Sequence, residues 1–453
     1  MLVIFGFLLT VIFGLFLILA IVPKMDPLAR LGGAYLLGLG LQTFFMFLLT
    51  FVNVSFTREN GFLILLVPTI SLLPLVRKRI KPYFLELRSS LVKISSFSSV
   101  EKMIIFLIIP FFLYSLIYDL YWPVTSWDSL VIYDWRAKLF ALIGSMDEAI
   151  NRGNFFGYPL LTSLAHTWAY LLGAKSPLFI FAVFYLAFTL MFYGAVKEMT
   201  SRVIGLLSVV FLITIPDIFF HSTSSYTNLP YTIYYDLGTI YLFLWMKNQT
   251  KGYFLLGCLL TGLSAWARSS EPFWLVNLGV LVIYALVKRK YFAPLIFSLI
   301  FFPIQQSWRK FEGAYLGENP PQVIKGVSLF FSYFNIPRMI KVCVYLFKGV
   351  ISTWQPLIFL FLLIVALEIK KRRIENFWLL LLIIGDFLLM VVGTFIVSYT
   401  YAEAWEQIPG SAQRMAMFFL PLFVFYIFSS DILKGLFSEK NKKLLPHFFR
   451  KIA

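Results

Sequence analysis

Residues 2–23 read LVIFGFLLTVIFGLFLILAIVP, an apolar run without a single charged residue. A helix needs about 20 such residues to cross the roughly 30 Å of hydrocarbon in a bilayer. No basic segment precedes the run and no clear cleavage site follows it, which is typical of a first membrane span rather than a removed signal peptide. Similar runs recur at 32–52, 61–76, 103–121, 177–196, 203–220, 229–246, 252–267, 272–287, 291–308, 343–367, 377–399 and 412–433. They predict an all-α polytopic membrane protein with about 13 transmembrane helices.

The composition supports this class. Of the 453 residues, 60% are hydrophobic and only 13% are charged, whereas soluble domains are about 25% charged. The net charge of +17 is concentrated between apolar runs, at Arg77-Lys78-Arg79, Lys288-Arg289-Lys290, Lys370-Lys371-Arg372-Arg373 and in the tail after Lys434. Basic loops are retained in the cytoplasm, so these segments define the cytoplasmic side. The charge therefore indicates topology and affinity for anionic lipid, and nucleic acid is not an expected partner.

Counting spans from these cytoplasmic segments divides the chain into four parts. They are an accessory set of N-terminal transmembrane helices at 1–76, a basic cytoplasmic loop at 77–102, the transmembrane core at 103–433 and a basic cytoplasmic tail at 434–453. The same count places two long loops, 122–176 and 309–341, outside the membrane. Within the first loop, 157–173 is predicted to be an amphipathic or re-entrant helix on the outer face. The polar residues that could carry chemistry then gather on this outer side.

The first outer loop contains the segment 127–138, which reads WDSLVIYDWRAK. Asp128 is expected in the first turn of a helix, where the helix dipole stabilises its anionic form. A carboxylate at the membrane surface suits a general base that deprotonates a hydroxyl; a simple N-terminal helix charge is the alternative. Asp134 points to a different face and is predicted to pair with Lys138, four residues later.

Other polar and sulfur-bearing residues carry no clear motif. Asp236 and Asp386 lie within apolar spans and are expected to face the bundle interior, because charge is costly near hydrocarbon. Cys258 and Cys343 have no neighbour at ligand spacing, which predicts small buried hydrophobes. The three histidines are scattered along the chain. No metal and no cofactor is expected.

A series of short motifs follows in order along 103–433. They are Asp128 with Tyr133 and Ala137, Tyr158-Pro159-Leu160-Leu161, Leu171-Leu172-Gly173, Ile215-Pro216-Asp217, Tyr226-Thr227-Asn228-Leu229-Pro230, the stretch from Gly262 to Glu271, and Ser411-Ala412-Gln413-Arg414. In order and sidedness this series resembles the GT-C glycosyltransferases. These integral-membrane enzymes use polyprenyl-phosphate sugars and include the protein mannosyltransferases and the lipid A aminoarabinose transferases.

The resemblance implies a GT-C-like core with juxtamembrane helices on the outer face and an inverting sugar transfer. Asp128 would be the catalytic base. Arg414 would bind the donor phosphate, and a snorkelling membrane anchor is its alternative role. Arg268 and Glu271 fall where relatives often carry Lys and Glu, with a mutual salt bridge as their alternative. The other residues expected to bind the donor phosphate or substrate are Lys138, Arg136, Tyr133, Tyr158, Asn228 and His221.

One position departs from the pattern. Relatives often carry Ala-Asp before the proline of the span-opening turn, where this chain has Thr227-Asn228. Asn228 can hydrogen-bond a sugar hydroxyl but cannot act as a base.

The expected partners are a polyprenyl-phosphate-linked sugar, an acceptor glycan, lipid or protein, and membrane lipid, at the outer face of the cell membrane. Two other functions stay open. A lipid-linked glycan polymerase or ligase would be expected to depend on Arg and His in a large outer loop. A transporter or flippase would be favoured by repeat symmetry and by broken helices that meet at the membrane midplane. Polar residues that gather at one face favour surface chemistry over transport.

Overall fold

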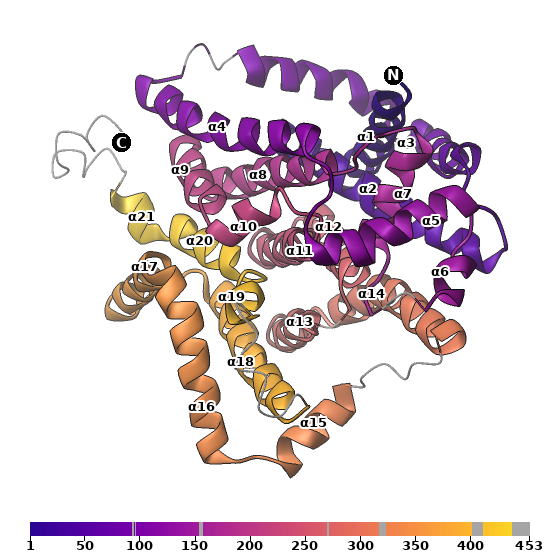
Figure 1. Cartoon of the computed structure of the whole chain (residues 1–453). Coiled ribbons are helices and arrows are strands. Elements are labelled where there is room, and N and C mark those ends of the chain that lie inside the picture. Colours follow the sequence, from indigo (N-terminus) through magenta and orange to yellow (C-terminus); the bar gives the residue numbers. More distant parts are fainter. Residues whose placement is uncertain are drawn as a thin grey trace.

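The computed structural model describes residues 1–92, 95, 97–153, 157–269, 271–316, 323–400 and 411–436, and within these ranges the chain is helical and contains no strand. The α-helices are α1 (Leu2–Ile21), α2 (Pro27–Phe51), α3 (Arg58–Val92), α4 (Ser99–Tyr121), α5 (Trp135–Ile143), α6 (Asp147–Asn151), α7 (Leu161–Leu171), α8 (Phe179–Met199), α9 (Arg202–Ile213), α10 (Pro216–His221), α11 (Asn228–Asn248), α12 (Lys251–Ala267), α13 (Trp274–Lys288), α14 (Phe292–Phe311), α15 (Val323–Ser332), α16 (Ile336–Leu346), α17 (Ser352–Lys370), α18 (Phe377–Thr400), α19 (Ser411–Ala416), α20 (Leu420–Ser429) and α21 (Asp431–Leu436). Short π-helical segments lie at η2 (Ser129–Asp134), η3 (Glu312–Leu316) and η4 (Phe347–Ile351). Figure 1 shows a bundle of packed helices from which α15 and α16 extend outward.

Six helices are long and apolar enough to cross a membrane: α1, α2, α3, α4, α8 and most of α18. A seventh span is added if α16 with η4 and α17, which meet at an angle of 103°, count as one broken span. The predicted all-α membrane class is confirmed. The predicted number of about 13 spans is not, since several other predicted spans are helices that are short or broken.

Two of the predicted single spans are broken helices. The segment 203–220 divides into α9 and α10, and Pro216 is the first residue of α10. Proline favours this position because its missing N–H is not needed there, whereas inside a continuous helix it would remove a hydrogen bond. The segment 412–433 divides into α19, α20 and the start of α21, and Pro421 lies in the first turn of α20. Hydropathy alone does not reveal these breaks.

Helix α11 lies inside the bundle, with every residue from Asn228 to Met246 buried. It packs along α12 so closely that a Cβ atom added at Gly238 would lie 2.5 Å from Thr261 Oγ1. Small residues allow this approach, and van der Waals packing is a main source of helix association in lipid. The beginning of α11 and the end of α12 lie together, since Arg268 reaches Asn228. We call the end of the bundle where α11 begins, at Asn228, and α12 ends, at Ala267, the site end.

The N-terminal helices pack directly on the core. A Cβ at Gly14 of α1 would lie 1.8 Å from the carbonyl oxygen of Ala34 in α2, so only glycine fits there. Helix α2 in turn reaches the core through two hydrogen bonds. Tyr234 Oη donates to the Leu36 carbonyl at 2.7 Å, and Trp266 Nε1 donates to Thr43 Oγ1 at 3.0 Å. The predicted accessory unit at 1–76 therefore packs directly against the core helices α11 and α12.

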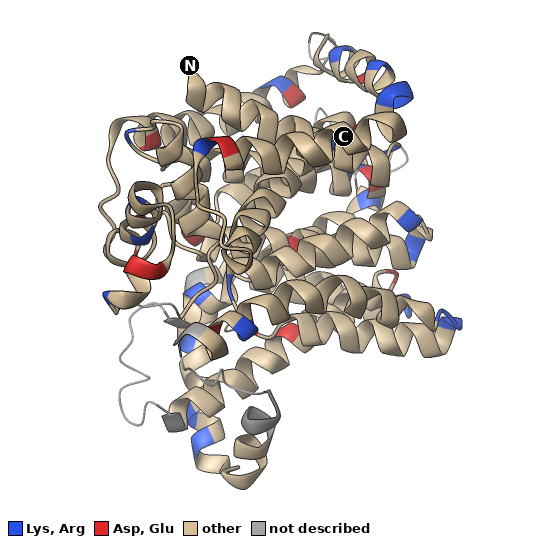
Figure 2. Cartoon of the chain, turned by 90° about the vertical axis from the view of Figure 1, so that its right-hand side faces the viewer, with Lys and Arg blue, Asp and Glu red and all other residues tan. Residues whose placement is uncertain are grey.

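The predicted basic loop at 77–102 is partly helical, because α3 continues as one helix through Val92. Helix α4 then begins at Ser99 and is capped by Ser98, whose side chain forms a capping box with Glu101. Glu101 also pairs with Arg202 at the start of α9. Figure 2 shows the basic residues mostly at the ends of helices.

The predicted outer-face helix at 157–173 corresponds to α7, which ends at Leu171 and is followed by Gly173 in the left-handed conformation (φ +85°). Its residues from Leu161 to Ala169 are buried, so α7 packs inside the protein instead of lying on its surface. Cys258 is buried as predicted, whereas Cys343 on α16 is exposed and the prediction for it is wrong. Asp236 and Asp386 are both 0% exposed, as expected for aspartates that face the bundle interior.

Candidate functional site

Arg268 is the centre of a largely buried group at the site end. It follows the last residue of α12 in extended conformation, at φ −155° and ψ 131°. Its guanidinium binds Glu271 at two points, with Nε 2.7 Å from Oε2 and Nη2 2.6 Å from Oε1. Nη1 makes longer contacts with Thr227 Oγ1 at 3.4 Å and Asn228 Oδ1 at 3.5 Å. This fork geometry holds the turn between α12 and α13 against the start of α11.

Aromatic rings enclose this guanidinium. The Cζ atom of Arg268 lies 4.5 Å from the Tyr158 ring centroid and 5.5 Å from that of Phe418. Tyr133 lies beside Tyr158, with ring centroids 6.3 Å apart, and its hydroxyl is 3.2 Å from Thr227 Oγ1. Five of the predicted site residues therefore lie in one group. We call it the Arg268 cluster, comprising Arg268, Glu271, Tyr133, Tyr158 and Asn228, together with Thr227.

The charge of Arg268 is already compensated. Burial alone would lower the pKa of Arg268, but the neighbouring Glu271 carboxylate raises it well above its usual value. The guanidinium therefore stays protonated and paired, and an anion from outside would have to compete with Glu271 for it. Burial also raises the pKa of Tyr133, which stays neutral. Arg268 and Glu271 therefore form the mutual salt bridge that the sequence analysis gave as their alternative role.

A second group forms around His221 on α10. The side chain is 1% exposed, and its Nδ1 lies 2.7 Å from the backbone carbonyl oxygen of Asp217. A carbonyl oxygen can only accept, so Nδ1 carries the proton and Nε2 carries the lone pair. Nε2 has no hydrogen-bond partner in the part of the chain that the structure describes. Burial lowers the pKa of His221 to about 4, with the charges of Arg414 and Arg268 adding to the effect, so the ring is neutral.

Asp128 and Arg414 lie beside this group, and neither has an ionic partner among the described residues. Asp128 is close enough to act electrostatically on Tyr226, whose ring packs on His221 with centroids 5.7 Å apart. Arg414 acts on Tyr226, His221 and Asp217. Both are half-buried, and neither charged group makes an ion pair or hydrogen bond within the described ranges. We call Asp128, Arg414 and His221, with Tyr226 between them, the unpaired group.

Asp134 contrasts with Asp128. Its carboxylate lies 2.7 Å from Lys138 Nζ, 2.5 Å from Tyr170 Oη and 3.3 Å from His166 Nδ1, and it is 1% exposed. Burial would raise the pKa of Asp134, but His166, Lys138 and Tyr170 bring it down to about 2. The predicted pairing of Asp134 with Lys138 is confirmed. Lys138 contacts Asp134 and Tyr170, so the structure does not bring it to the Arg268 cluster.

Arg136 lies behind Tyr133, completely buried. Its Nε donates to the Ile132 carbonyl at 3.1 Å, and its Cζ lies 5.6 Å from the Tyr133 ring centroid. Burial lowers the pKa of Arg136 to about 10, so it remains charged at neutral pH. From this place Arg136 packs against the Tyr133 ring, and its predicted part in substrate binding stays a prediction.

Four residues of these groups were not predicted as site residues: Asp217, Tyr226, Thr227 and Phe418. Tyr226 and Thr227 directly precede Asn228 in the same sequence motif, so their position was a usable signal. Asp217 stands four residues before His221, the spacing at which a helical side chain reaches a backbone carbonyl. Phe418 is one of 51 phenylalanines, and nothing in the sequence distinguishes it.

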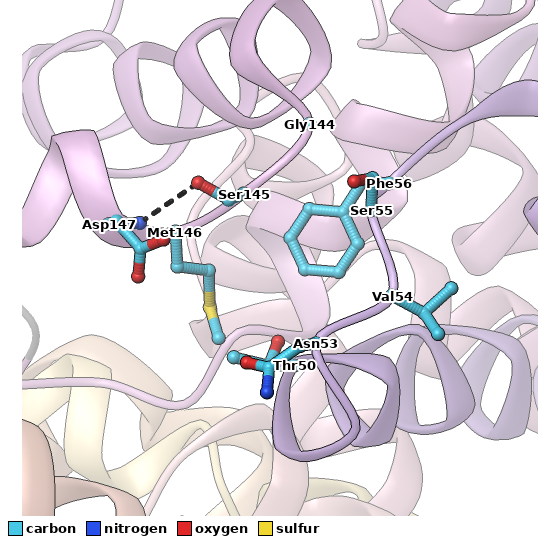
Figure 3. Close-up of a pocket in the computed structure, with 9 residues that line it drawn as sticks. All are labelled: Thr50, Asn53, Val54, Ser55, Phe56, Gly144, Ser145, Met146 and Asp147. Carbon is cyan, nitrogen blue, oxygen red and sulfur yellow. Dashed lines mark hydrogen bonds between the residues drawn. The ribbon is translucent and has the colours of Figure 1, made fainter.

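A separate pocket of about 210 Å³ lies between the turn after α2 and the turn before α6. Figure 3 shows its lining, in which Thr50, Asn53 and Ser55 face Ser145 and Asp147 across Phe56 and Met146. None of the predicted site residues lines it. Over the described ranges, no group of three His, Cys, Asp or Glu residues is arranged to hold a metal ion.

Comparison of the chain with protein families, with curated proteins and with solved structures finds no match. The resemblance to the GT-C glycosyltransferases therefore rests on the sequence motifs alone. What the structure defines is the class, an all-helical protein with several helices able to span a membrane.

Proposed function

We propose that the protein is a glycosyltransferase with a GT-C-like core that transfers a sugar from a polyprenyl-phosphate donor to an acceptor hydroxyl. Its site lies at the outer face of the cell membrane. The observation that carries the proposal is the unpaired group. In it the half-buried Asp128 carboxylate and Arg414 guanidinium both act electrostatically on Tyr226, and neither has an ion pair or hydrogen bond among the residues that the structure describes. Charged groups that are partly removed from water without a partner are candidates for a functional site, because a ligand can supply the missing interaction. A substrate with both a phosphate and a hydroxyl satisfies both charges at once.

In this mechanism Arg414 binds the donor phosphate. A guanidinium presents paired N–H donors that match two phosphate oxygens, and it stays charged at every physiological pH. Arg414 has no ion pair to break within the described ranges, although the Asp217 carboxyl lies within electrostatic range of it. Arg268 differs, since Glu271 already occupies its fork. The Arg268 cluster therefore forms the wall of the site, with Asn228 and Thr227 available to hydrogen-bond sugar hydroxyls.

Asp128 acts as the general base. It takes the proton of the acceptor hydroxyl, whose oxygen then attacks the anomeric carbon while the bond to the phosphate oxygen breaks. The phosphate leaves as an anion that Arg414 stabilises, so one base and one cation are sufficient. Glycosidases, by contrast, need two carboxyl groups because their leaving group must be protonated. Neutral His221 offers only an acceptor at Nε2 and adds no positive charge to the site.

The class is tested by sugar transfer with purified full-length protein in lipid nanodiscs and a mixed pool of polyprenyl-phosphate sugars. Products are identified by mass spectrometry beside empty nanodiscs. The proposal predicts transfer or slow donor hydrolysis by the wild type only. Absence of both across the pool contradicts it. Movement of intact donor across a vesicle bilayer without chemical change would instead identify a flippase.

The proposed chemistry needs no metal ion. Activity is therefore expected to be unchanged in EDTA. Activity that vanishes in EDTA and returns with Mn²⁺ would overturn this mechanism, while leaving the enzyme class intact.

A further inference from the structure

Two carboxyl groups lie deep inside the bundle, away from the proposed site chemistry. Asp236 is near the middle of α11 and Asp386 is near the middle of α18, and both are 0% exposed. Each lies within electrostatic range of the other. Ionisable side chains at this depth are costly and usually mark ion or proton sites.

The two carboxyl groups have four oxygen atoms, of which one is hydrogen-bonded. Tyr235 Oη donates to Asp386 Oδ1 at 2.6 Å. The other three oxygens, both of Asp236 and Oδ2 of Asp386, have no partner in the described part of the chain. No Lys, Arg or His there forms an ion pair with either aspartate. Two carboxylates that share a single hydrogen-bond donor and have no cation cannot both remain charged in such a place.

A third helix brings further oxygen atoms to this region. Gly385, next to Asp386, packs against α13 so closely that an added Cβ would lie 2.5 Å from Val276. The following residue of α13, Asn277, donates from Nδ2 to Thr239 Oγ1 of α11 at 3.0 Å. The helices that carry the two carboxyl groups, α11 and α18, therefore both pack against α13, and Thr239 and Asn277 add a hydroxyl and an amide at this level. Carboxylate, hydroxyl and amide oxygens are ligands that hard cations prefer.

We propose that Asp236 and Asp386 form an intramembrane binding site for a monovalent cation, with Na⁺ as its ion. Protons alone would remove the charge but would still leave the oxygens of Asp236 without partners, which costs free energy in a dry interior. A sodium ion between the two side chains ligates these oxygens together. One proton on the pair balances the remaining negative charge. Oxygen-lined Na⁺ sites near the membrane midplane have this chemistry.

The ion site is connected to the site end through two tyrosines of α11. Tyr235, which binds Asp386, stacks on Tyr231 with ring centroids 5.9 Å apart and an interplanar angle of 4°. The Tyr231 hydroxyl in turn donates to the backbone carbonyl of Glu271 at 3.1 Å. Bound Na⁺ therefore fixes α11 against α18 directly beneath the Arg268 cluster. The inference does not depend on the proposed glycosyl transfer.

The test is saturable binding of radioactive sodium to the purified full-length protein, together with its thermal unfolding midpoint in NaCl and in choline chloride at equal ionic strength. The wild type is expected to bind Na⁺ and to unfold at a higher temperature in NaCl. Asp236→Asn and Asp386→Asn are each expected to weaken Na⁺ binding more than about tenfold. Glu368→Gln is the matched control, since Glu368 is also buried and accepts a 2.5 Å hydrogen bond from Tyr426.

The wild-type measurement decides the proposal even if an aspartate variant fails to fold. Absence of saturable Na⁺ binding, with an unfolding midpoint that depends on pH but not on Na⁺, would show that protons alone neutralise the pair. Equal Na⁺ binding by the wild type and both asparagine variants would place the ion elsewhere. Either result overturns the proposal, and neither bears on glycosyl transfer.

Discussion

Asp128 and Asp134 lie six residues apart on the same segment, but their surroundings are opposite. Asp134 is buried and bound by Lys138, Tyr170 and His166. Asp128 is half-buried and its carboxylate has no partner among the described residues. The same contrast separates Arg268, which is bound by Glu271, from Arg414, which has no carboxylate partner within the described part of the chain. Paired charges of this kind build the wall of a site, whereas unpaired charges are available to a substrate.

The largest expected effect is on catalysis, through Arg414. Arg414→Ala should reduce turnover about 10²- to 10³-fold, the usual cost of removing one charge-stabilising donor. Arg414→Lys should recover only part of this loss, because an ammonium group cannot bind phosphate oxygens in a fork. The thermal unfolding midpoint should hardly change, since Arg414 forms no ion pair with the residues that the structure describes. Steady-state kinetics measures the loss of turnover. The control is Arg152→Ala, since Arg152 is an exposed arginine that pairs with Glu148. A large loss of stability would contradict the assignment.

The next effect is on stability, through Asp134. Asp134→Ala should lower the free energy of unfolding by about 3 kcal/mol, because it leaves buried His166 and Tyr170 without their acceptor. The folded pKa of Asp134, about 2, lies below the unfolded value of about 3.9. Its contribution is therefore present above pH 4 and is lost as the pH falls toward 2. Chemical denaturation at several pH values measures the loss of unfolding free energy and its dependence on pH. Asp147→Ala, at an exposed position, is the control. If Asp134→Ala kept its stability but lost turnover, Asp134 would have a catalytic role instead of a structural one, which would contradict the contrast with Asp128.

A smaller effect is expected from Glu271. Glu271→Gln should destabilise the fold by about 2 kcal/mol, less than for a fully buried pair because both side chains are slightly exposed. Turnover per folded molecule should fall much less than in Arg414→Ala. Unfolding and kinetics on the same preparation measure the two effects. Loss of turnover as great as that of Arg414→Ala would move Glu271 from the wall of the site into its chemistry.

The smallest effect is a pH dependence due to His221. Its folded pKa of about 4 lies below the unfolded value of about 6.5, so stability is present above pH 6.5 and is lost as the pH falls. Between pH 6.5 and 5.5 this loss should be about 1 kcal/mol. His221→Asn should remove that slope. The unfolding midpoint of both proteins across this range is the measurement, and equal slopes would show that His221 is not buried as a neutral ring.

The sequence predicts the helical membrane class well, because long apolar runs have few other solutions. The predicted number of about 13 spans is not confirmed. Hydropathy does not distinguish a continuous helix from the pair α9 and α10, where Pro216 starts a new helix. It also does not show that α7 is buried, because burial depends on neighbours supplied by distant segments.

The candidate site was predictable where its contacts are local. Lys138 stands four residues from Asp134 and Glu271 three from Arg268, spacings at which helices and turns bring charges together. His166 and Tyr170 come to Asp134 from 32 and 36 residues away. No local pattern predicts such contacts, and they are the reason why Asp134 differs from Asp128.

The most direct test of this account is the rate of sugar transfer by Asp128→Asn in lipid nanodiscs, measured beside the wild type and Asp147→Asn with the same donor. The account predicts a fall of about 10³-fold for Asp128→Asn, with its unfolding midpoint unchanged and with Asp147→Asn as active as the wild type. Equal turnover by Asp128→Asn and the wild type would contradict it, because the unpaired carboxylate would then have no part in the chemistry.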